Sequence, residues 1–326
     1  MEWLKNIDFE NQNGTWLPMI NDFERNQFYD QIICRNVAGK RCLDIGFGTG
    51  LLSILALKHG AKSILAYESN PDRYLMAKDI IKWLKLQSKI VLVNEHYDHT
   101  LGVHNIDTVI SETLCGNLWA EGMYRSMPRQ PGIQFLPGRY FLEIYAVPIS
   151  PSFAQGLIEP SDDQWRFAPG VDMPDQFVAA VNLIIAKKYH TVIKSKRPIR
   201  LSQGIVNFSS QHQTVWGKMP QQRAVTHGKC MASYIVDTDT VTINNQPIDF
   251  DSHTYQLHVT TKDWQDLTVL IVPRVGVIHD NVKLYLDTGH WGPTKDPAIL
   301  HKPLEDLTVT HDLLTGTITY TTKEKK

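Results

Sequence analysis

The sequence predicts an α/β domain followed by a mostly β domain, and three observations lead to this fold class. Before about residue 140, short β-branched runs alternate with helical patterns, and a glycine-rich loop joins the first run to the next helix; later segments are mainly β-rich. Alternating strands and helices indicate a parallel sheet covered on both faces, whereas closely spaced strands indicate an antiparallel sheet or barrel. We therefore expect one domain over residues 1–140 and a second over 141–326.

Each element of the first domain follows from a local pattern of apolar residues and breakers. Asn70 is a suitable N-cap with Pro71 in the first helical position, and Gly60 is a suitable C-cap. The predicted elements are a helix over 17–33, a strand over 42–45, a helix over 51–59, a strand over 62–67, a helix over 71–86, and strands over 90–93 and 106–110.

The second domain is predicted from β-branched runs separated by turn-forming residues. This pattern favours an antiparallel sheet or barrel. The segments predicted as strands are 191–193, 240–243, 255–259, 267–272, 282–286 and 315–320.

Composition and charge narrow the functional classes. The chain has 33 Lys and Arg residues against 34 Asp and Glu residues, so no overall basic field exists to hold nucleic acid or an anionic membrane. The four cysteines, at positions 34, 42, 115 and 230, lack the spacing of a zinc site or a disulfide framework, which suits a reducing compartment. No segment approaches the ~20 apolar residues that span a bilayer, and no leader pattern is present. We expect a cytoplasmic protein without a membrane partner.

The glycine loop indicates a ligand site. The segment from Asp44 has glycines at 46, 48 and 50 between a strand and a helix, and glycine lets a backbone approach a bulky ligand because it has no Cβ. Dinucleotide-binding loops usually read Gly-x-Gly-x-x-Gly, but here the third position is Leu51. Glu68, at the end of the second strand, is placed to accept hydrogen bonds from ribose hydroxyls. The loop therefore predicts a nucleoside-bearing ligand other than a dinucleotide.

Two glutamates indicate which chemical group the ligand-binding edge of the sheet could hold. Glu112 ends the fourth strand, at the sheet edge where open α/β folds bind ligands, and Glu121 follows after a loop containing Gly116. The guanidinium of arginine is planar and charged, and it presents donors in a fork that suits carboxylates. Two glutamates could hold such a group and direct one nitrogen.

These residues resemble the protein arginine methyltransferases. In that family the strand end reads Ser-Glu, then Gly, then Glu-x-Met, and Ser111, Glu112, Gly116, Glu121 and Met123 are similar in kind and spacing. The resemblance implies S-adenosylmethionine as cofactor and transfer of a methyl group to a guanidino nitrogen of arginine in a protein or peptide. It also implies a Rossmann-like S-adenosylmethionine-binding domain, an antiparallel β-barrel domain, and a homodimer formed through an arm near residues 160–190.

The resemblance assigns further residues. It implies that Arg25 binds the cofactor carboxylate, that Met19 lines the site near the sulfonium, and that Asp98 contacts adenine. The family's Thr-His-Trp loop is similar to residues 288–291, with a glycine inserted, which pairs His290 with Asp22. An ungapped match puts Asp296 at the histidine position instead. The predicted catalytic residues are Glu112, Glu121, Asp22 and His290, and the predicted cofactor-binding residues are Met19, Arg25, Asp44, Gly46, Gly48, Gly50, Glu68 and Asp98.

Other functions remain open at this point. Basic residues between 187 and 200 could contact the phosphates of a nucleic acid. However, enzymes that methylate base amines usually carry Asn/Asp-Pro-Pro-aromatic after the fourth strand, where this chain has Ser-Glu-Thr-Leu, and a cytosine enzyme needs Pro-Cys, whereas Cys115 follows a leucine. The same residues are also consistent with a methyltransferase for free arginine or another small guanidine, and with a non-catalytic relative that binds cofactor or a partner.

Overall fold

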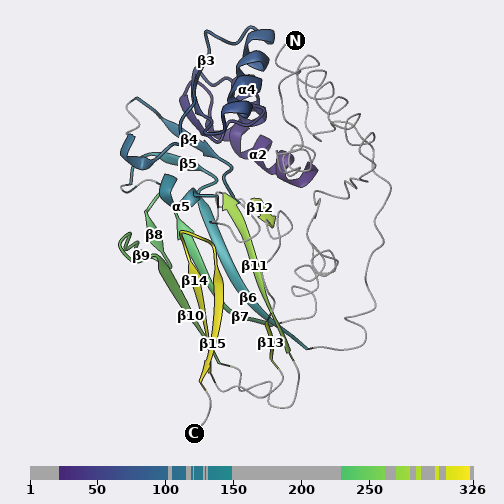
Figure 1. Ribbon diagram of the computed structural model, residues 1–326, viewed down its shortest axis with the longest axis vertical. Helices are drawn as coiled ribbons and strands as arrows, with labels where there is room; N and C mark the ends of the chain where they lie inside the picture. The colour runs from purple at the N-terminus through teal and green to yellow at the C-terminus, as the bar shows by residue number, and fades with distance from the viewer. Residues whose placement is uncertain are drawn as a thin grey trace, which may run out of the picture. The chain divides into compact units, whose positions relative to one another are not determined.

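A computed structural model describes part of the chain as two compact units (Figure 1). The first holds the described residues up to Glu112 together with Gly132–Pro137, and the second holds the described residues of Thr113–Pro131 and those from Gly138 onward. The domain boundary near residue 140 stays a prediction. The described residues are 22–101, 105–114, 119, 121–127, 129, 131–148, 229–260, 269–279, 284–287, 298–300 and 306–323.

The first unit contains a parallel five-stranded sheet in the order β3-β2-β1-β4-β5. The central strands β1 and β4 are buried almost throughout, as expected for strands covered on both faces. This confirms the predicted Rossmann-like α/β fold. The bounds are β1 Arg41–Ile45, β2 Ser63–Tyr67, β3 Ile90–Val93, β4 Thr108–Ser111, β5 Gln134–Leu136, α2 Phe23–Asn36, α3 Leu51–Lys58, α4 Pro71–Trp83 and the 3-10 helix η2 His99–Leu101.

The helix ends follow from the capping residues. Helix α4 begins at Pro71, where the Asn70 side chain accepts hydrogen bonds from two backbone N–H groups, as the sequence predicts. It ends at Trp83 rather than at residue 86, because Lys85 has a φ of 57°, in the left-handed region that ends a helix. Residues before Asp22 lie outside the described part, so the predicted start of α2 at residue 17 is not tested.

The second unit is built from antiparallel strands, as predicted. Its seven-stranded sheet runs β12-β11-β6-β7-β8-β9, with β13 paired to β11, and a three-stranded sheet runs β10-β14-β15 (Figure 1). The described strands do not include a closed barrel. The bounds are β6 Arg139–Pro148, β7 Lys229–Asp237, β8 Thr242–Ile243, β9 Gln246–Pro247, β10 Thr254–Thr260, β11 Val269–His279, β12 Leu284–Asp287, β13 Ala298–Leu300, β14 Asp306–Asp312 and β15 Ile318–Lys323.

Two predicted strands begin later than expected because side chains cap turns there. Asp237 accepts hydrogen bonds from the backbone N–H groups of Asp239 and Thr240, so β8 starts at Thr242 instead of 240. Asp312 caps the next turn in the same way, which delays β15 to residue 318. The predicted strand over 191–193 lies outside the described residues.

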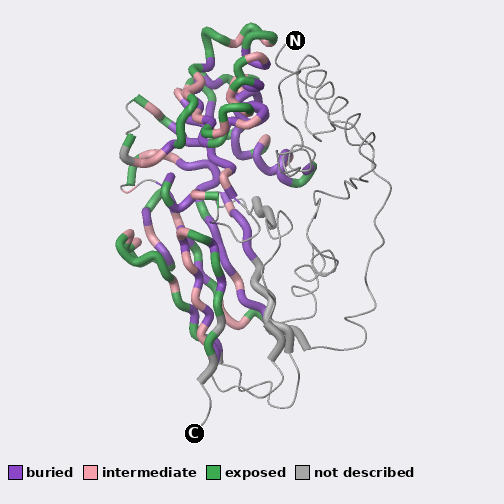
Figure 2. The backbone as a smooth tube through the Cα atoms, viewed as in Figure 1, coloured by how far each residue is buried: buried purple, intermediate pink, exposed green. Residues whose placement is uncertain are grey.

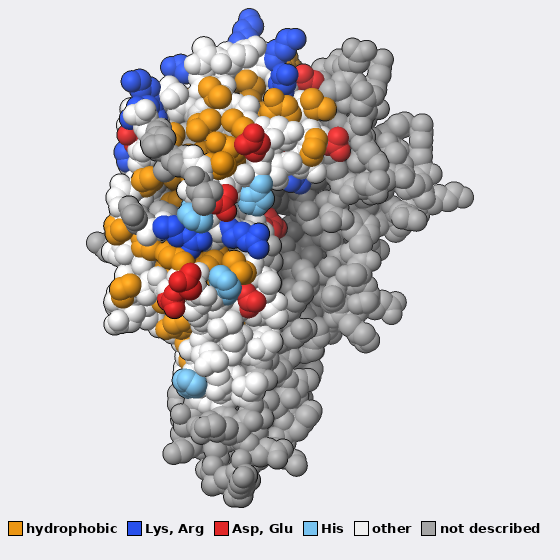
Figure 3. Space-filling model, turned by 60° about the vertical axis from the view of Figure 1, so that its left-hand side comes forward, with side chains coloured by type: hydrophobic (Ala, Val, Ile, Leu, Met, Phe, Trp, Pro, Cys, Tyr) orange, Lys and Arg blue, Asp and Glu red, His pale blue; other side chains and the backbone are white. Residues whose placement is uncertain are grey.

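Each unit has its own core (Figure 2). In the first, Tyr29, Ile32 and Leu43 have no exposed surface, and in the second the same holds for Trp119 and Tyr234. Charged side chains of both signs are interspersed on the face in Figure 3, in keeping with the near-zero net charge. None of the helices in the described part is long and apolar enough to cross a membrane. The basic stretch between 187 and 200 lies outside the described residues.

Candidate functional site

The glycine loop connects β1 to α3 and needs glycine for its backbone angles. Gly46, Gly48 and Gly50 have φ values of 83°, 56° and 84°, a region that L side chains rarely adopt. A Cβ on Gly50 would also lie 2.6 Å from the Phe47 ring, so this position excludes a side chain for steric reasons as well. The loop is held to β2, because the backbone N–H groups of residues 46 and 47 both donate to the Tyr67 carbonyl.

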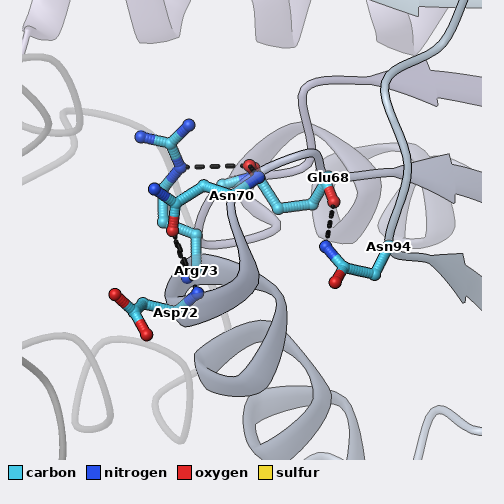
Figure 4. Close-up of polar contacts among 6 residues, drawn as sticks. Glu68, Asn70, Asp72, Arg73 and Asn94 are labelled. Carbon is cyan, nitrogen blue, oxygen red and sulfur yellow. Dashed lines mark hydrogen bonds and ion pairs between the residues drawn. The ribbon is translucent and has the colours of Figure 1, made fainter.

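Glu68 links the glycine loop to the start of α4, and Figure 4 shows its contact with Arg73 of that helix. Its side chain is buried, and Oε2 accepts a hydrogen bond from the Gly48 N–H at 2.9 Å. Oε1 accepts from the Asn70 N–H at 2.9 Å and from Arg73 Nε at 3.1 Å. A carboxylate has about four acceptor positions, so one position is left on Oε2 for a ligand hydroxyl. Binding of both ribose hydroxyls to Glu68 stays a prediction. The sequence reasoning did not single out Arg73, which follows Glu68 by five residues in the first turn of α4.

Asp44 is a buried carboxylate with an unused acceptor. Oδ2 accepts a hydrogen bond from Ser53 Oγ at 2.6 Å, whereas Oδ1 is buried without a hydrogen-bond partner. Burial raises the pKa of Asp44 to about 6; the Ser53 hydrogen bond and the charge of Arg25 lower it, and the charge of Glu68 raises it. An unsatisfied buried oxygen is costly, so a ligand that brings a donor or a positive charge to Oδ1 would be favoured.

This shift makes stability depend on pH. The pKa of Asp44 is raised from 3.8 to about 6, so the folded chain binds the proton more tightly than the unfolded chain. The free energy of unfolding should therefore fall as pH rises between these values, by ~3 kcal/mol. Urea denaturation at pH 4, 5, 6 and 7 should show this fall, and Asp44→Asn should remove most of it. An equal slope in both proteins would contradict the assignment.

Arg25 and Glu112 form a buried ion pair. Arg25 lies in the first turn of α2, and Glu112 directly follows β4; Nη2 and Oε2 are 2.5 Å apart, with both side chains 4% exposed. Burial opposes the charge of Arg25, but Glu112 and Tyr29 outweigh it, and the pKa of Arg25 is raised. The Tyr29 hydroxyl also donates to the Ser111 carbonyl, which joins the helix to the strand end. The sequence assigned Arg25 to the cofactor and Glu112 to the acceptor, and the structure brings the two together.

Arg25 also has an unused donor. Nη1 donates to Asn26 Oδ1 at 3.0 Å and Nη2 donates to Glu112, whereas Nε is buried without a hydrogen-bond partner. The first unit therefore holds an unsatisfied buried donor on Arg25 and an unsatisfied buried acceptor on Asp44. A free amino-acid group, with its carboxylate and ammonium, complements this pair. These residues fit the amino-acid part of S-adenosylmethionine.

The other predicted residues are placed as follows. Asp22 is the N-cap of α2, and its side chain accepts a hydrogen bond from the Arg25 N–H at 3.1 Å. Asp98 lies after β3, where its carboxylate is 3.2 Å from His99 Nδ1, and its contact with adenine stays a prediction. Met19 and His290, the predicted partner of Asp22, lie outside the described residues, as does Asp296.

Glu121 belongs to the second unit, whereas Glu112 belongs to the first. It is exposed and lies in a turn closed by the hydrogen bond from the Gly122 N–H to the Trp119 carbonyl, 3.0 Å long. The short helix α5, Met123–Ser126, follows directly. The joint action of the two glutamates stays a prediction.

Comparison with known proteins identifies relatives. Residues 27–120 match the family model for ribosomal protein L11 methyltransferase (PrmA). Human protein arginine N-methyltransferase 9 is 35% identical over 115 residues, which is 33% of this chain and 14% of that protein. The probable protein arginine N-methyltransferase 6 of Arabidopsis thaliana is 30% identical over 169 residues, 49% of this chain and 38% of that protein. Over part of its length, the chain is similar in sequence to protein arginine methyltransferases.

The protein arginine methyltransferases also match in fold. The structure described as PRMT6-SAH has a TM-score of 0.53 and 16% identity, and the match covers 94% of this chain and 98% of that one. A second PRMT6 structure gives a TM-score of 0.54 over 93% of this chain and 96% of the other. At this identity the likeness shows the fold alone, and it agrees with a parallel α/β unit and an antiparallel β unit. In sequence, the chain spans less than half the length of the first two curated relatives named above.

Proposed function

We propose that this chain is an S-adenosylmethionine-dependent methyltransferase that modifies a guanidino nitrogen of arginine in a protein or peptide. One observation carries the choice of acceptor. Glu112, at the carboxyl end of β4, already binds a guanidinium group, that of Arg25, through a charged hydrogen bond. The relationship to the arginine methyltransferases supports the same conclusion.

The first unit supports the cofactor assignment. Arg25 Nε and Asp44 Oδ1 are buried and unsatisfied, so they are available to a carboxylate and to an ammonium group. The glycine loop lets a ligand approach the backbone between β1 and α3, and Glu68 keeps one acceptor position for a ribose hydroxyl. When bound, S-adenosylmethionine supplies a methyl group activated by its sulfonium. A PRMT6 relative is described with SAH.

The glutamates have different roles in the proposed reaction. Glu112 orients the acceptor guanidinium at the end of β4. Glu121 attracts the positive charge of the guanidinium away from the attacking nitrogen and accepts its proton, directly or through water. Glu112 and Glu121 would together align the acceptor nitrogen with the methyl group that bound S-adenosylmethionine would supply. Most of the rate enhancement comes from this alignment, which can be worth ~7 to 11 kcal/mol.

The proposal is tested by methyl transfer. The purified chain is incubated with methyl-labelled S-adenosylmethionine and an arginine-containing peptide, and hydrolysed product is analysed for methylarginines. We expect label in methylarginine and none when every arginine of the peptide is replaced by lysine. Parallel reactions with free arginine and with RNA test whether either is the acceptor instead. Cofactor binding by calorimetry without any methylarginine would contradict the proposed activity and favour a non-catalytic relative.

The homodimer remains a prediction, because its arm near residues 160–190 lies outside the described residues. The cytoplasmic location also remains a prediction. Sedimentation velocity of the purified chain would decide its oligomeric state.

A further inference from the structure

Glu121 is an exposed residue between two buried ones. Trp119 and Met123 have no exposed surface, and the backbone turn between Trp119 and Gly122 presents Glu121 to solvent. Gly122 has a φ of 92°, which permits the chain to enter α5 directly after the turn. The position of the Glu121 carboxylate therefore depends on how firmly the two flanking side chains are held.

The apolar anchoring is extensive. The Trp119 ring lies 5.4 Å from the Tyr140 ring and 6.3 Å from the Tyr124 ring, between centroids. Aromatic pairs at these separations attract each other beyond the surface they bury. Packing alone, however, allows a ring to slide within its pocket. A hydrogen bond from the indole fixes its orientation as well.

A buried polar chain supplies that orientation. Trp119 Nε1 donates to the Tyr234 hydroxyl oxygen at 2.9 Å, and this hydroxyl lies 2.7 Å from His311 Nδ1. Because an indole N–H only donates, the tyrosine oxygen is the acceptor in the hydrogen bond with Trp119.

These three hydrogen-bonded side chains connect the Glu121 turn to both sheets of the second unit. Tyr234 lies in β7 and His311 in β14, and both are buried. Burial raises the pKa of the Tyr234 phenol well above its usual range, so it keeps its hydrogen at ordinary pH. Buried polar groups that satisfy one another restrict a site to one arrangement, because breaking any link leaves a donor or acceptor without water.

We propose that Trp119, Tyr234 and His311 are positioning residues that hold the turn bearing Glu121 on the β unit. None of the three is assigned to the reaction itself. This inference rests on the proposed function for its effect on turnover, whereas its structural part concerns the second unit alone.

The test compares two substitutions that both remove the hydrogen bond between Trp119 and Tyr234. Tyr234→Phe keeps the ring and also removes the contact with His311, whereas Trp119→Phe also replaces the indole by a smaller ring. Trp119→Phe and Tyr234→Phe are measured for kcat and KM on the arginine peptide, for cofactor affinity by calorimetry, and for amide hydrogen exchange of residues 119–126. We expect kcat to fall ~10- to 100-fold, since displacement of a reacting group by about 1 Å has effects of this size. The cofactor Kd should stay within about twofold, because the cofactor residues belong to the first unit. The kcat of the double variant Trp119→Phe with Tyr234→Phe should be only slightly lower than that of either single variant, because both changes break the same hydrogen bond.

Two matched controls separate this role from general stability. Tyr255→Phe removes only the hydroxyl, which accepts a hydrogen bond from Asn244 at the surface. The ring, 5.0 Å from the Tyr234 ring between centroids, is kept, so kcat should not change. His311→Asn keeps a side chain that can hydrogen-bond near the position of Nδ1 and should retain more activity than His311→Leu. Exchange in the 119–126 segment should rise in Trp119→Phe and Tyr234→Phe but not in Tyr255→Phe.

The outcomes distinguish the two proposals. Unchanged kcat and unchanged exchange in Trp119→Phe and Tyr234→Phe would overturn the positioning role. If the unsubstituted protein methylates no arginine, the proposed function is overturned. If amide exchange still rises in Trp119→Phe and Tyr234→Phe, the anchoring of the turn stands. If one of the two variants fails to fold, the other one carries the test. Trp119→Phe and Tyr234→Phe both break the hydrogen bond between Trp119 and Tyr234.

Discussion

Glu121→Gln should bind S-adenosylmethionine with unchanged affinity and lose at least about 100-fold in turnover, the lower end of what a general acid–base residue contributes. Glutamine has nearly the same size as glutamate, so the turn closed by Trp119 and Gly122 should keep its shape. The amide carries no negative charge to attract the guanidinium and accepts no proton. The change should therefore act on kcat rather than on cofactor binding.

Calorimetry for the cofactor and labelled methyl transfer to an arginine peptide measure the two effects separately. Asp251→Asn is the control, because it removes one negative charge from another exposed position of the second unit. It should leave both quantities unchanged. Turnover of Glu121→Gln equal to that of Asp251→Asn would remove Glu121 from the mechanism.

Glu112→Gln should destabilise the cofactor-free chain by ~3 to 5 kcal/mol, the usual cost of removing one partner from a buried ion pair. The Arg25 guanidinium is 4% exposed and would lose the carboxylate that its Nη2 contacts. Added S-adenosylmethionine should restore part of the loss, since its carboxylate offers Arg25 a new partner. The double variant Arg25→Met with Glu112→Gln should be less destabilised than the sum of its single variants.

Urea denaturation with and without the cofactor measures these differences. Asp107→Asn is the control, because Asp107 forms a pair with Arg41 in the same unit, with both side chains about 40% exposed. Exposed pairs contribute little, so this substitution should change stability far less. A loss in Glu112→Gln no larger than in this control would show that the Arg25–Glu112 contact does not stabilise the chain.

Local patterns were sufficient for four of the five strands of the α/β unit, whereas β5, Gln134–Leu136, was not predicted. The glycine loop, the Asn70 cap and the short β-branched strands each depend on neighbours within a few residues, so the sequence predicted them with small errors at the ends. The β unit was predicted less completely. Strands β6 and β7 were missed, although they pair along nearly their whole length, because their pairing joins residues about ninety apart in the sequence.

Two features of the site required the tertiary structure. The sequence marked Arg25 and Glu112 separately, but their ion pair depends on how α2 packs beside the end of β4, 87 residues along the chain. The chain from Trp119 through Tyr234 to His311 joins residues 115 and 77 positions apart and follows no motif.

The sequence by itself determined the α/β class, the mainly antiparallel second part and the resemblance to the arginine methyltransferases. These depend on local periodicity and on short motifs such as the loop from Asp44 to Gly50. Only the tertiary structure decided which polar groups of the site satisfy one another and which stay unsatisfied, including Arg25 Nε and Asp44 Oδ1. The physical reason is that burial and hydrogen-bond partners are set by distant segments, whereas a motif records only its own residues.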